Sequence, residues 1–147
     1  RRSPADNRTD CWFCLASPSC EKHLIVSVFE SCYVAMTKGP LNDHHTLVVP
    51  VSHERGKTAG ALLDPAIGKE VEEVKTKLRR HADEVLGKDL FVFERAIATR
   101  GGYHTHVQCV PVERGSGPKL RRAMMELAGR TRGFELREVQ NASLSLG

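Results

Sequence analysis

Three polar side chains that can do chemistry lie at alternate positions in one short segment: His104, His106 and Gln108. We expect a strand over residues 105–111, on which alternate side chains point to the same face. An imidazole held on a rigid strand can attack phosphorus, and a Gln amide or a second imidazole can stabilise charge on the phosphate. The alternative is a solvent-facing strand with three satisfied polar groups, and these residues alone do not separate the two interpretations.

A second chemical feature is the pair Cys11 and Cys14 in the run C-W-F-C. Two thiolates at this spacing can bind one ion, and soft sulfur favours zinc. A tetrahedral site needs two more ligands, and we expect His53 and His104 at strand ends that hold an imidazole rigidly. The sequence therefore predicts a structural zinc site of Cys11, Cys14, His53 and His104. The alternative is a pair of buried thiols beside core aromatic residues.

Composition limits the class of protein. The chain has 147 residues, of which 40% are hydrophobic and 27% charged, as in a soluble globular domain. No apolar run approaches the roughly 20 residues of a membrane-spanning helix, so we expect no membrane partner. The net charge of +4 permits a polyanionic partner without requiring one. Five cysteines in no regular framework favour a reducing compartment, with Cys20, Cys32 and Cys109 as small core residues.

Strands and helices alternate in no regular order along the chain. Runs of β-branched and aromatic residues predict strands at 23–29, 31–36, 46–51, 90–94 and 105–111, with a weaker one at 134–139. Run 46–51 is continuously apolar, as expected of a strand buried on both faces. This order predicts an α+β fold with a mostly antiparallel sheet of about five strands, one long helix and one short helix.

The long helix is expected to begin at Asp64-Pro65, with Asp as its cap, and to end before Gly87. Its apolar stripe comprises Ile67, Val71, Val74, Leu78 and Val85. The short helix is expected from Pro118 to about Leu127, with Leu120, Met124 and Leu127 facing inward.

Two stretches resemble the histidine-triad superfamily. Residues 43–53 resemble its "PGHTLVIPxxH" segment, and residues 104–111 resemble its triad strand. The sequence is more closely similar to the first C-terminal domain of the CwfJ family of splicing-associated proteins. The runs CWFC, HLIVSV, CYVAMTKGPL, HTLVVPV and FVFER carry this likeness across residues 11–112. The resemblance implies a zinc-stapled fold of the histidine-triad type.

The CwfJ resemblance also implies a setting for the domain. It implies a nuclear protein that acts in pre-mRNA splicing or intron-lariat turnover, with spliceosomal or lariat-debranching proteins as partners. In a longer protein, a metallophosphoesterase-like segment would precede this domain and a second small domain would follow. We expect a flexible leader at 1–10, the domain at 11–132, and a terminal strand or tail at 133–147 that can begin a following domain.

The histidine-triad resemblance assigns roles to individual residues. It places His106 at the nucleophile position, Gln108 at the phosphate-positioning one, as in the hexose-phosphate uridylyltransferase branch, and His45 in the nucleotide pocket. It makes His104 a metal ligand, with Cys11, Cys14 and His53. The active hydrolases have an Asn and a donor cluster before the triad, where this chain has Glu94-Arg95 and Arg100-Gly101-Gly102-Tyr103. We expect Arg95 and Arg100 to contact phosphate and to neutralise Glu94.

These features leave three functional hypotheses. The first is a module that binds RNA or a nucleotide phosphate. The second is a nucleotidyl hydrolase or transferase that works through a phosphohistidine intermediate on His106. The third is a zinc-stabilised interaction domain with an inactive pocket.

Basic residues near the second helix can contact RNA or form a solvated face: Lys119, Arg121, Arg122, Arg130 and Arg132. Isolated domains can also pair as homodimers through a strand edge.

Overall fold

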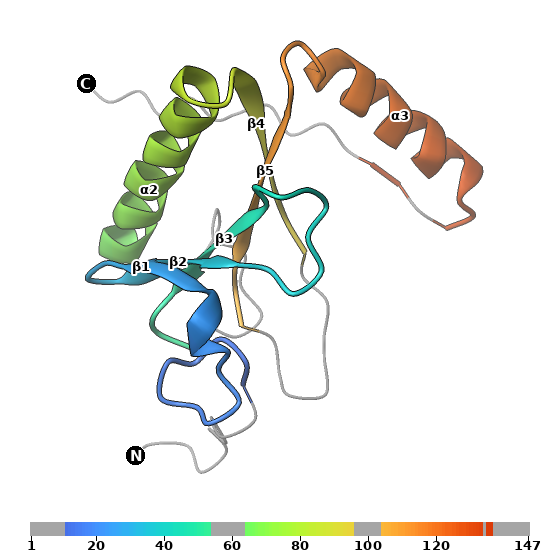
Figure 1. The fold of residues 1–147 in the computed structure, drawn as a ribbon. Coiled ribbons are helices and arrows are strands. Elements are labelled where there is room, and N and C mark those ends of the chain that lie inside the picture. The colour runs from blue at the N-terminus through green and yellow to red at the C-terminus, as the bar shows by residue number, and fades with distance from the viewer. Residues whose placement is uncertain (1–10, 54–63, 96–103, 134, 137–147) are drawn as a thin grey trace. The chain divides into compact units, whose positions relative to one another are not determined.

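The computed structural model describes residues 11–53, 64–95, 104–133 and 135–136. These residues form an α+β fold with one five-stranded antiparallel sheet in the order β1-β2-β3-β5-β4 (Figure 1). The elements are the 3-10 turn η2 (Lys22–Leu24), β1 (Ile25–Val28), β2 (Cys32–Met36), β3 (Thr46–Pro50), α2 (Pro65–Glu84), β4 (Lys88–Glu94), β5 (Val107–Glu113) and α3 (Gly117–Arg130). The fold class predicted from the sequence is confirmed.

The chain divides into two compact units. Residues 1–114 form the unit that contains the sheet and α2, and residues 115–147 form the unit that contains α3. Among the described residues, no helix combines the length and the apolar character needed to cross a membrane.

β3 lies at the centre of the sheet, as its continuous apolar run predicts. It pairs with β2 from Cys32↔Pro50 to Met36↔Thr46, and with β5 from Thr46↔Cys109 to Val48↔Val107. Its side chains at positions 47–49 are buried in both directions. The strand therefore has neighbours on both sides over residues 46–48, and its end at Pro50 is paired with Cys32 of β2.

α2 covers one face of the sheet, and its start matches the prediction (Figure 1). The Asp64 carboxylate accepts a hydrogen bond from the backbone N–H of Ala66 at 2.9 Å. Val71 and Val74 are buried against sheet residues that include Val48. The prediction that Val85 faces inward is wrong: this residue is exposed because it forms the C-cap, where the chain leaves the helix.

Glu70 ties α2 to the turn between β1 and β2. Its carboxylate accepts backbone hydrogen bonds from Ser31 at 2.6 Å and Glu30 at 3.2 Å, and it also bonds the Cys32 thiol. Burial alone would raise the pKa of Glu70, but these hydrogen bonds together lower it. The ionised carboxylate is therefore the form that the folded state favours.

The N-terminal described segment packs on the opposite face of the sheet. Side chains alternate along each strand, so Tyr33 and Leu47 lie on the face away from α2. They form a second apolar cluster with Ala35 and Val49, and Phe13 and Leu15 pack against it. The segment that carries Cys11 and Cys14 is thereby held against the centre of the sheet.

Several strand boundaries differ from the prediction. β1 begins at Ile25 rather than at residue 23, because residues 22–24 form a 3-10 turn. β5 begins at Val107 rather than at Thr105, because pairing with both β3 and β4 stops at Val107. His104 and His106 therefore lie in the segment that leads into β5, and only Gln108 of the three lies on the strand.

α3 is longer than the predicted second helix and buries less. Met124 and Leu127, which were expected to face inward, are exposed, and Ala128 is the buried residue of the helix. α3 is the one helix or strand described in its unit, so no second described element of that unit covers the stripe. The strand predicted at 134–139 falls almost wholly outside the described residues, and Glu135 and Leu136 are not in a strand.

Candidate metal centre and phosphate site

The four predicted ligands meet in one cluster. Sγ of Cys11, Sγ of Cys14 and nitrogens of His53 and His104 all lie within 4.8 Å of one another. The Cys14 sulfur lies 3.1 Å from Nδ1 of His53 and 3.7 Å from Nδ1 of His104, and the Cys11 sulfur lies 3.5 Å from the same His104 nitrogen. Both cysteines and His104 are buried.

These separations fit a four-coordinate metal ion. Metal–sulfur and metal–nitrogen bonds of about 2.3 and 2.0 Å place neighbouring donors of a tetrahedron about 3.3–3.8 Å apart. The observed 3.1–3.7 Å lies close to that interval. The donor set therefore forms a Cys₂His₂ cluster that could hold a metal ion.

The orientation of His104 is set by the end of β3. Its Nε2–H donates to the backbone carbonyl of Pro50 at 2.9 Å, so Nδ1 is the nitrogen that faces the sulfurs. Such a hydrogen bond from the far ring nitrogen is the usual support of a metal-binding histidine. Because His53 follows Pro50 by three residues, one strand end places both imidazoles.

His106 is oriented by the backbone of the preceding ligand. Its Nδ1–H donates to the carbonyl of His104 at 2.9 Å, so in the neutral ring the lone pair lies on Nε2. Burial lowers the pKa of His106, and the carbonyl of His104 partly opposes that shift. Arg95 lowers the pKa further and Glu94 raises it, so the predicted residues Glu94 and Arg95 both act electrostatically on this imidazole.

His45 is a buried donor next to Gln108. The backbone N–H of Leu41 donates to its Nδ1 at 3.1 Å, which places the proton of the neutral ring on Nε2. Nε2 has no hydrogen-bond partner within the described part of the chain, although the side chain is only 2% exposed. Burial lowers the pKa of His45, and the Gln108 side chain partly opposes this shift.

Gln108 lies on the sheet face that α2 does not cover. It pairs with Leu47 of β3 and with Phe93 of β4, and it is partly buried. His45 precedes Leu47 by two positions, and its ring lies 6.5 Å from that of Phe93. His45, just before β3, and Gln108, on the adjacent strand β5, thus come to one place, whereas Arg100 lies outside the described residues.

Two supporting residues were missed by the sequence analysis. The Phe13 ring stacks on His106, with ring centroids 4.7 Å apart. The Asn42 side chain donates to the carbonyl of Pro111 at 2.7 Å and so ties the turn before His45 to β5. The position of Phe13 between the two cysteines was a usable signal for the first. Nothing in the local sequence indicates the second, since its partner is 69 residues away.

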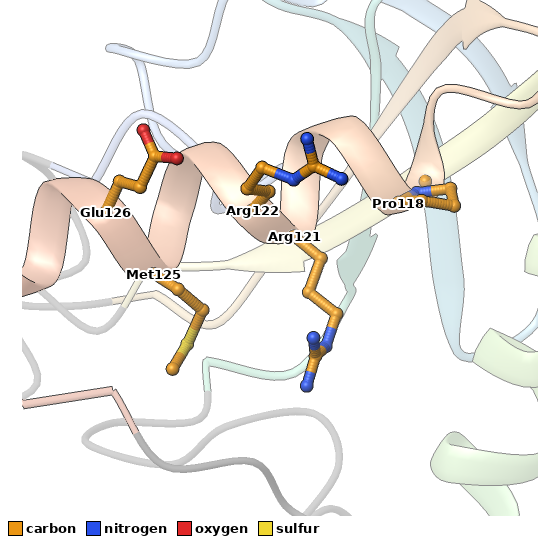
Figure 2. Close-up of a pocket in the computed structure, with 6 residues that line it drawn as sticks. Pro118, Arg121, Arg122, Met125 and Glu126 are labelled. Carbon is orange, nitrogen blue, oxygen red and sulfur yellow. The ribbon is translucent and has the colours of Figure 1, made fainter.

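The basic residues of the second unit lie on and just after α3. Figure 2 shows Arg121 and Arg122 extending to different sides of the helix, with Met125 and Glu126 one turn further on. The pocket in this view is lined by six residues of α3 itself: Gly117, Pro118, Arg121, Arg122, Met125 and Glu126. Exposed side chains include Lys119, Arg121, Arg122, Arg130 and Arg132. This arrangement fits a solvated helix face as well as an RNA contact, and RNA contact stays a prediction.

Comparison with known proteins identifies the family. Residues 1–124 match the family model described as "Protein similar to CwfJ C-terminal". The chain belongs to the CwfJ family. This CwfJ domain is 41% identical over 102 residues to the human CWF19-like protein 1, covering 69% of this chain and 18% of the relative. It is 36% identical over 136 residues to zinc finger CCCH domain-containing protein 64 of Arabidopsis thaliana, covering 92% and 22% respectively. The chain therefore spans about a fifth of these relatives.

Solved structures show that the fold of the CwfJ domain is of the histidine-triad type. A Zn-bound histidine triad family protein from Mycobacterium smegmatis aligns with a TM-score of 0.51 and 21% identity, covering 74% of this chain and 88% of that one. A Hit-like protein from Bartonella henselae aligns with a TM-score of 0.50 and 21% identity, covering 63% and 71%. The family and the fold expected from the sequence motifs are both confirmed.

Proposed function

We propose that this CwfJ domain binds the phosphate of a nucleotide or RNA, and that it does so within pre-mRNA splicing or intron-lariat turnover. The observation that carries the proposal is the buried imidazole of His45, whose Nε2–H meets no acceptor in full hydrogen-bond geometry among the described residues and has the Gln108 side chain as its polar neighbour. A buried donor without a partner costs free energy, and a bound phosphate oxygen would satisfy it.

The surrounding groups suit an anionic ligand. The Gln108 amide adds neutral donors, and Arg95 can supply a positive charge close to His106. Burial lowers the pKa of His45 and so favours the neutral ring, whose proton lies on Nε2 because Nδ1 accepts from Leu41. Arg100 belongs to the same proposal through the family resemblance alone.

We also propose that the metal is zinc and that its role is structural. Two thiolates and two imidazoles are a donor set that zinc prefers, and they would tie residues 11–14 to the ends of β3 and β5. Metal analysis after dialysis should give one equivalent of zinc per chain. Less than about half an equivalent would contradict this part of the proposal.

The biological setting follows from family membership. CwfJ proteins resemble one another across this domain and are associated with splicing, which supports a nuclear location and spliceosomal or lariat-debranching partners. Since the chain spans about a fifth of its relatives, the activity of the whole protein is a separate question.

The binding proposal is tested with His45→Gln and the matched control His44→Gln, which changes the adjacent, exposed histidine. A hydrogen bond to a charged group contributes about 1.5–3 kcal/mol, so His45→Gln should weaken binding of a nucleoside monophosphate or a 5′-phosphorylated RNA by roughly 10- to 150-fold. Isothermal titration calorimetry provides the dissociation constants. Equal binding by wild type and His45→Gln, or equal binding of the unphosphorylated nucleoside, would refute the proposal.

The orientation of His106 favours a second candidate function, nucleotidyl hydrolysis or transfer. The Nε2 lone pair would attack the α-phosphorus, and the bond to the leaving oxygen would break with its electron pair remaining on that oxygen. Water or another acceptor would then attack the phosphohistidine and restore the neutral imidazole. The domain would thus release a nucleoside monophosphate or transfer it.

The enzyme hypothesis has its own test. Wild type and His106→Ala are incubated with nucleoside phosphoramidates, dinucleoside polyphosphates and capped RNA. Turnover in wild type that is abolished in His106→Ala would establish the enzyme. Retained phosphate binding without turnover would reject it and leave the binding module. Neither binding nor turnover would point to an interaction domain with an inactive pocket.

A further inference from the structure

Two aromatic residues between the cysteines of the metal centre point in opposite directions. Trp12 is 61% exposed, and its ring contacts the Lys38 ammonium group at 4.7 Å. Phe13 instead packs inward: its ring stacks on His106 at an interplanar angle of 29° and meets the ring of His104 edge-on at 5.9 Å. One residue thus touches both the metal ligand His104 and the imidazole of the proposed phosphate site.

The backbone of Phe13 is held from the sheet as well. The Tyr33 hydroxyl, on β2, donates to the Phe13 carbonyl at 2.7 Å, and the Tyr33 side chain is only 2% exposed. The segment turns immediately afterwards, with the backbone N–H of Ser17 donating to the Cys14 carbonyl at 2.8 Å. The two cysteines and Tyr33 therefore fix the position of Phe13 independently of His106.

We propose that Phe13 is a positioning residue that couples the metal centre to the orientation of His106. The hydrogen bond from Nδ1–H to the His104 carbonyl fixes one edge of the His106 ring, and a bond along one edge does not by itself set the tilt of the ring plane. Offset stacking on Phe13 restrains that plane. This inference rests on the proposed phosphate site, and it assigns to the segment 11–14 a role beyond holding metal.

The coupling has a thermodynamic consequence. A metal ion bound by Cys11 and Cys14 restrains the residues between them, and loss of the ion would release that restraint. Phe13 would then sample other positions, and His106 would occupy its oriented state for a smaller fraction of the time. A ligand that needs the oriented state would bind more weakly in proportion to that fraction.

The first test observes His106 directly, without any ligand. Long-range ¹H–¹⁵N NMR of the metal-loaded protein reports the tautomer and the ring-proton shifts of each histidine. A ring stacked on an aromatic face has its protons shifted upfield, so Phe13→Leu should move the His106 signals downfield. Trp12→Leu, the matched control in the same segment, should leave the His106 signals unchanged. Phe13→Tyr, which keeps an aromatic ring at this position, should give His106 signals like those of the wild type.

The second test measures binding of a nucleoside monophosphate to the same variants. Aromatic pairing of this kind corresponds to a change of roughly 2- to 10-fold in the dissociation constant, which we expect for Phe13→Leu and not for Trp12→Leu. The metal content of each sample is measured as well, so that weaker ligand binding caused by loss of the metal can be distinguished from weaker binding caused by loss of the Phe13 ring. If Phe13→Leu does not fold, Tyr33→Phe removes the single bond to the Phe13 carbonyl and should shift the His106 signals in the same direction to a smaller extent.

The outcomes separate this inference from the proposed function. Unchanged His106 signals in metal-loaded Phe13→Leu, or equal changes in Trp12→Leu, would overturn the positioning role whatever the protein binds. A downfield shift confined to Phe13→Leu, in a protein that binds no phosphate, would support the positioning of His106 and refute the phosphate-binding function. Removal of the metal from wild type should reproduce the downfield shift, and an unaltered His106 signal would refute the coupling to the metal.

Discussion

Replacing Cys14 by serine is the sharpest test of the metal centre. The Cys14 sulfur lies close to both ligand histidines, at 3.1 Å from His53 and 3.7 Å from His104. Cys14→Ser replaces the thiolate that lies next to both histidines with a neutral hydroxyl. We therefore expect zinc affinity to fall by more than the 10- to 100-fold typical of a change outside the ligand shell.

The magnitude follows from binding linkage. A metal ion that binds only the folded chain stabilises it by about 2.7 kcal/mol at a free concentration of 100 times its Kd, and by about 1.4 kcal/mol more for each further tenfold increase. For a chain of this length, 1 kcal/mol corresponds to about 2–4 °C in Tm. The wild-type Tm should thus rise by roughly 3–6 °C per tenfold increase in free zinc, and the Cys14→Ser curve should lie lower by at least one such step.

The assay is differential scanning calorimetry in zinc buffers with a non-thiol reductant. Cys20→Ser is the matched control, because Cys20 is a partly exposed cysteine in the same segment that is not part of the cluster. We expect its Tm to follow the wild-type dependence on zinc. A wild-type Tm that does not depend on free zinc, or the same dependence in Cys14→Ser, would refute the argument that these four residues bind the metal.

Three further predictions concern the framework of the site. Hydrogen bonding lowers the pKa of Glu70, so its carboxylate stabilises the fold above the pKa that it has in the unfolded chain, and this contribution is lost as the pH falls. In urea titrations, Glu70→Gln should be less stable than wild type at pH 7 and should differ from it less at pH 3. Burial raises the pKa of Cys32 to about 12, with Glu70 adding to the shift, and burial raises the pKa of Cys109 to about 11. Iodoacetamide should therefore alkylate neither thiol in the native protein at pH 8, as measured by mass spectrometry. Rapid labelling of either cysteine in the native protein would contradict this. Gly87 has φ +63° whereas Gly68 lies inside α2, and a Cβ added at either position meets no atom within 4 Å. In the same urea titrations, Gly87→Ala should therefore destabilise the protein by about 1–2 kcal/mol and Gly68→Ala should stabilise it by up to about 1 kcal/mol. Changes of the same sign in both variants would refute the backbone argument.

Features that depend on neighbouring residues could be predicted from the sequence. Asp64 followed by Pro65 carries the cap and the first turn of α2 within the sequence itself, and the structure shows that cap. The apolar run of β3 requires burial on both faces wherever the strand lies, which places it at the centre of the sheet. The four residues of the Cys₂His₂ cluster could be predicted because thiols at C-x-x-C spacing need two further ligands to bind a metal, and strand ends limit which histidines can supply them.

Features set by the exact course of the backbone, or by which element covers a surface, could not be predicted. The tautomer of His45 is set by the backbone of Leu41, and no side-chain pattern encodes that contact. Val85 continues the heptad spacing of α2, yet the helix ends one residue earlier and the side chain is exposed. The exposure of Met124 and Leu127 could not be predicted either. An apolar stripe on a helix predicts that another surface covers it, but it does not say whether that surface belongs to the same unit.

The run His104–Gln108 looks like one triad in the sequence, but in the structure His104 and His106 are connected to each other while Gln108 lies beside His45. The ring of His104 faces the cysteines, while its backbone carbonyl accepts the proton of His106 Nδ1. A substitution of His104 should therefore empty the metal centre and disorient His106 together, so its loss of function would not distinguish a catalytic from a structural role. Only variants that spare the four cluster residues, at His106 or Phe13, separate the two, because they alter the imidazole of the proposed phosphate site while the Cys₂His₂ cluster keeps all four donors.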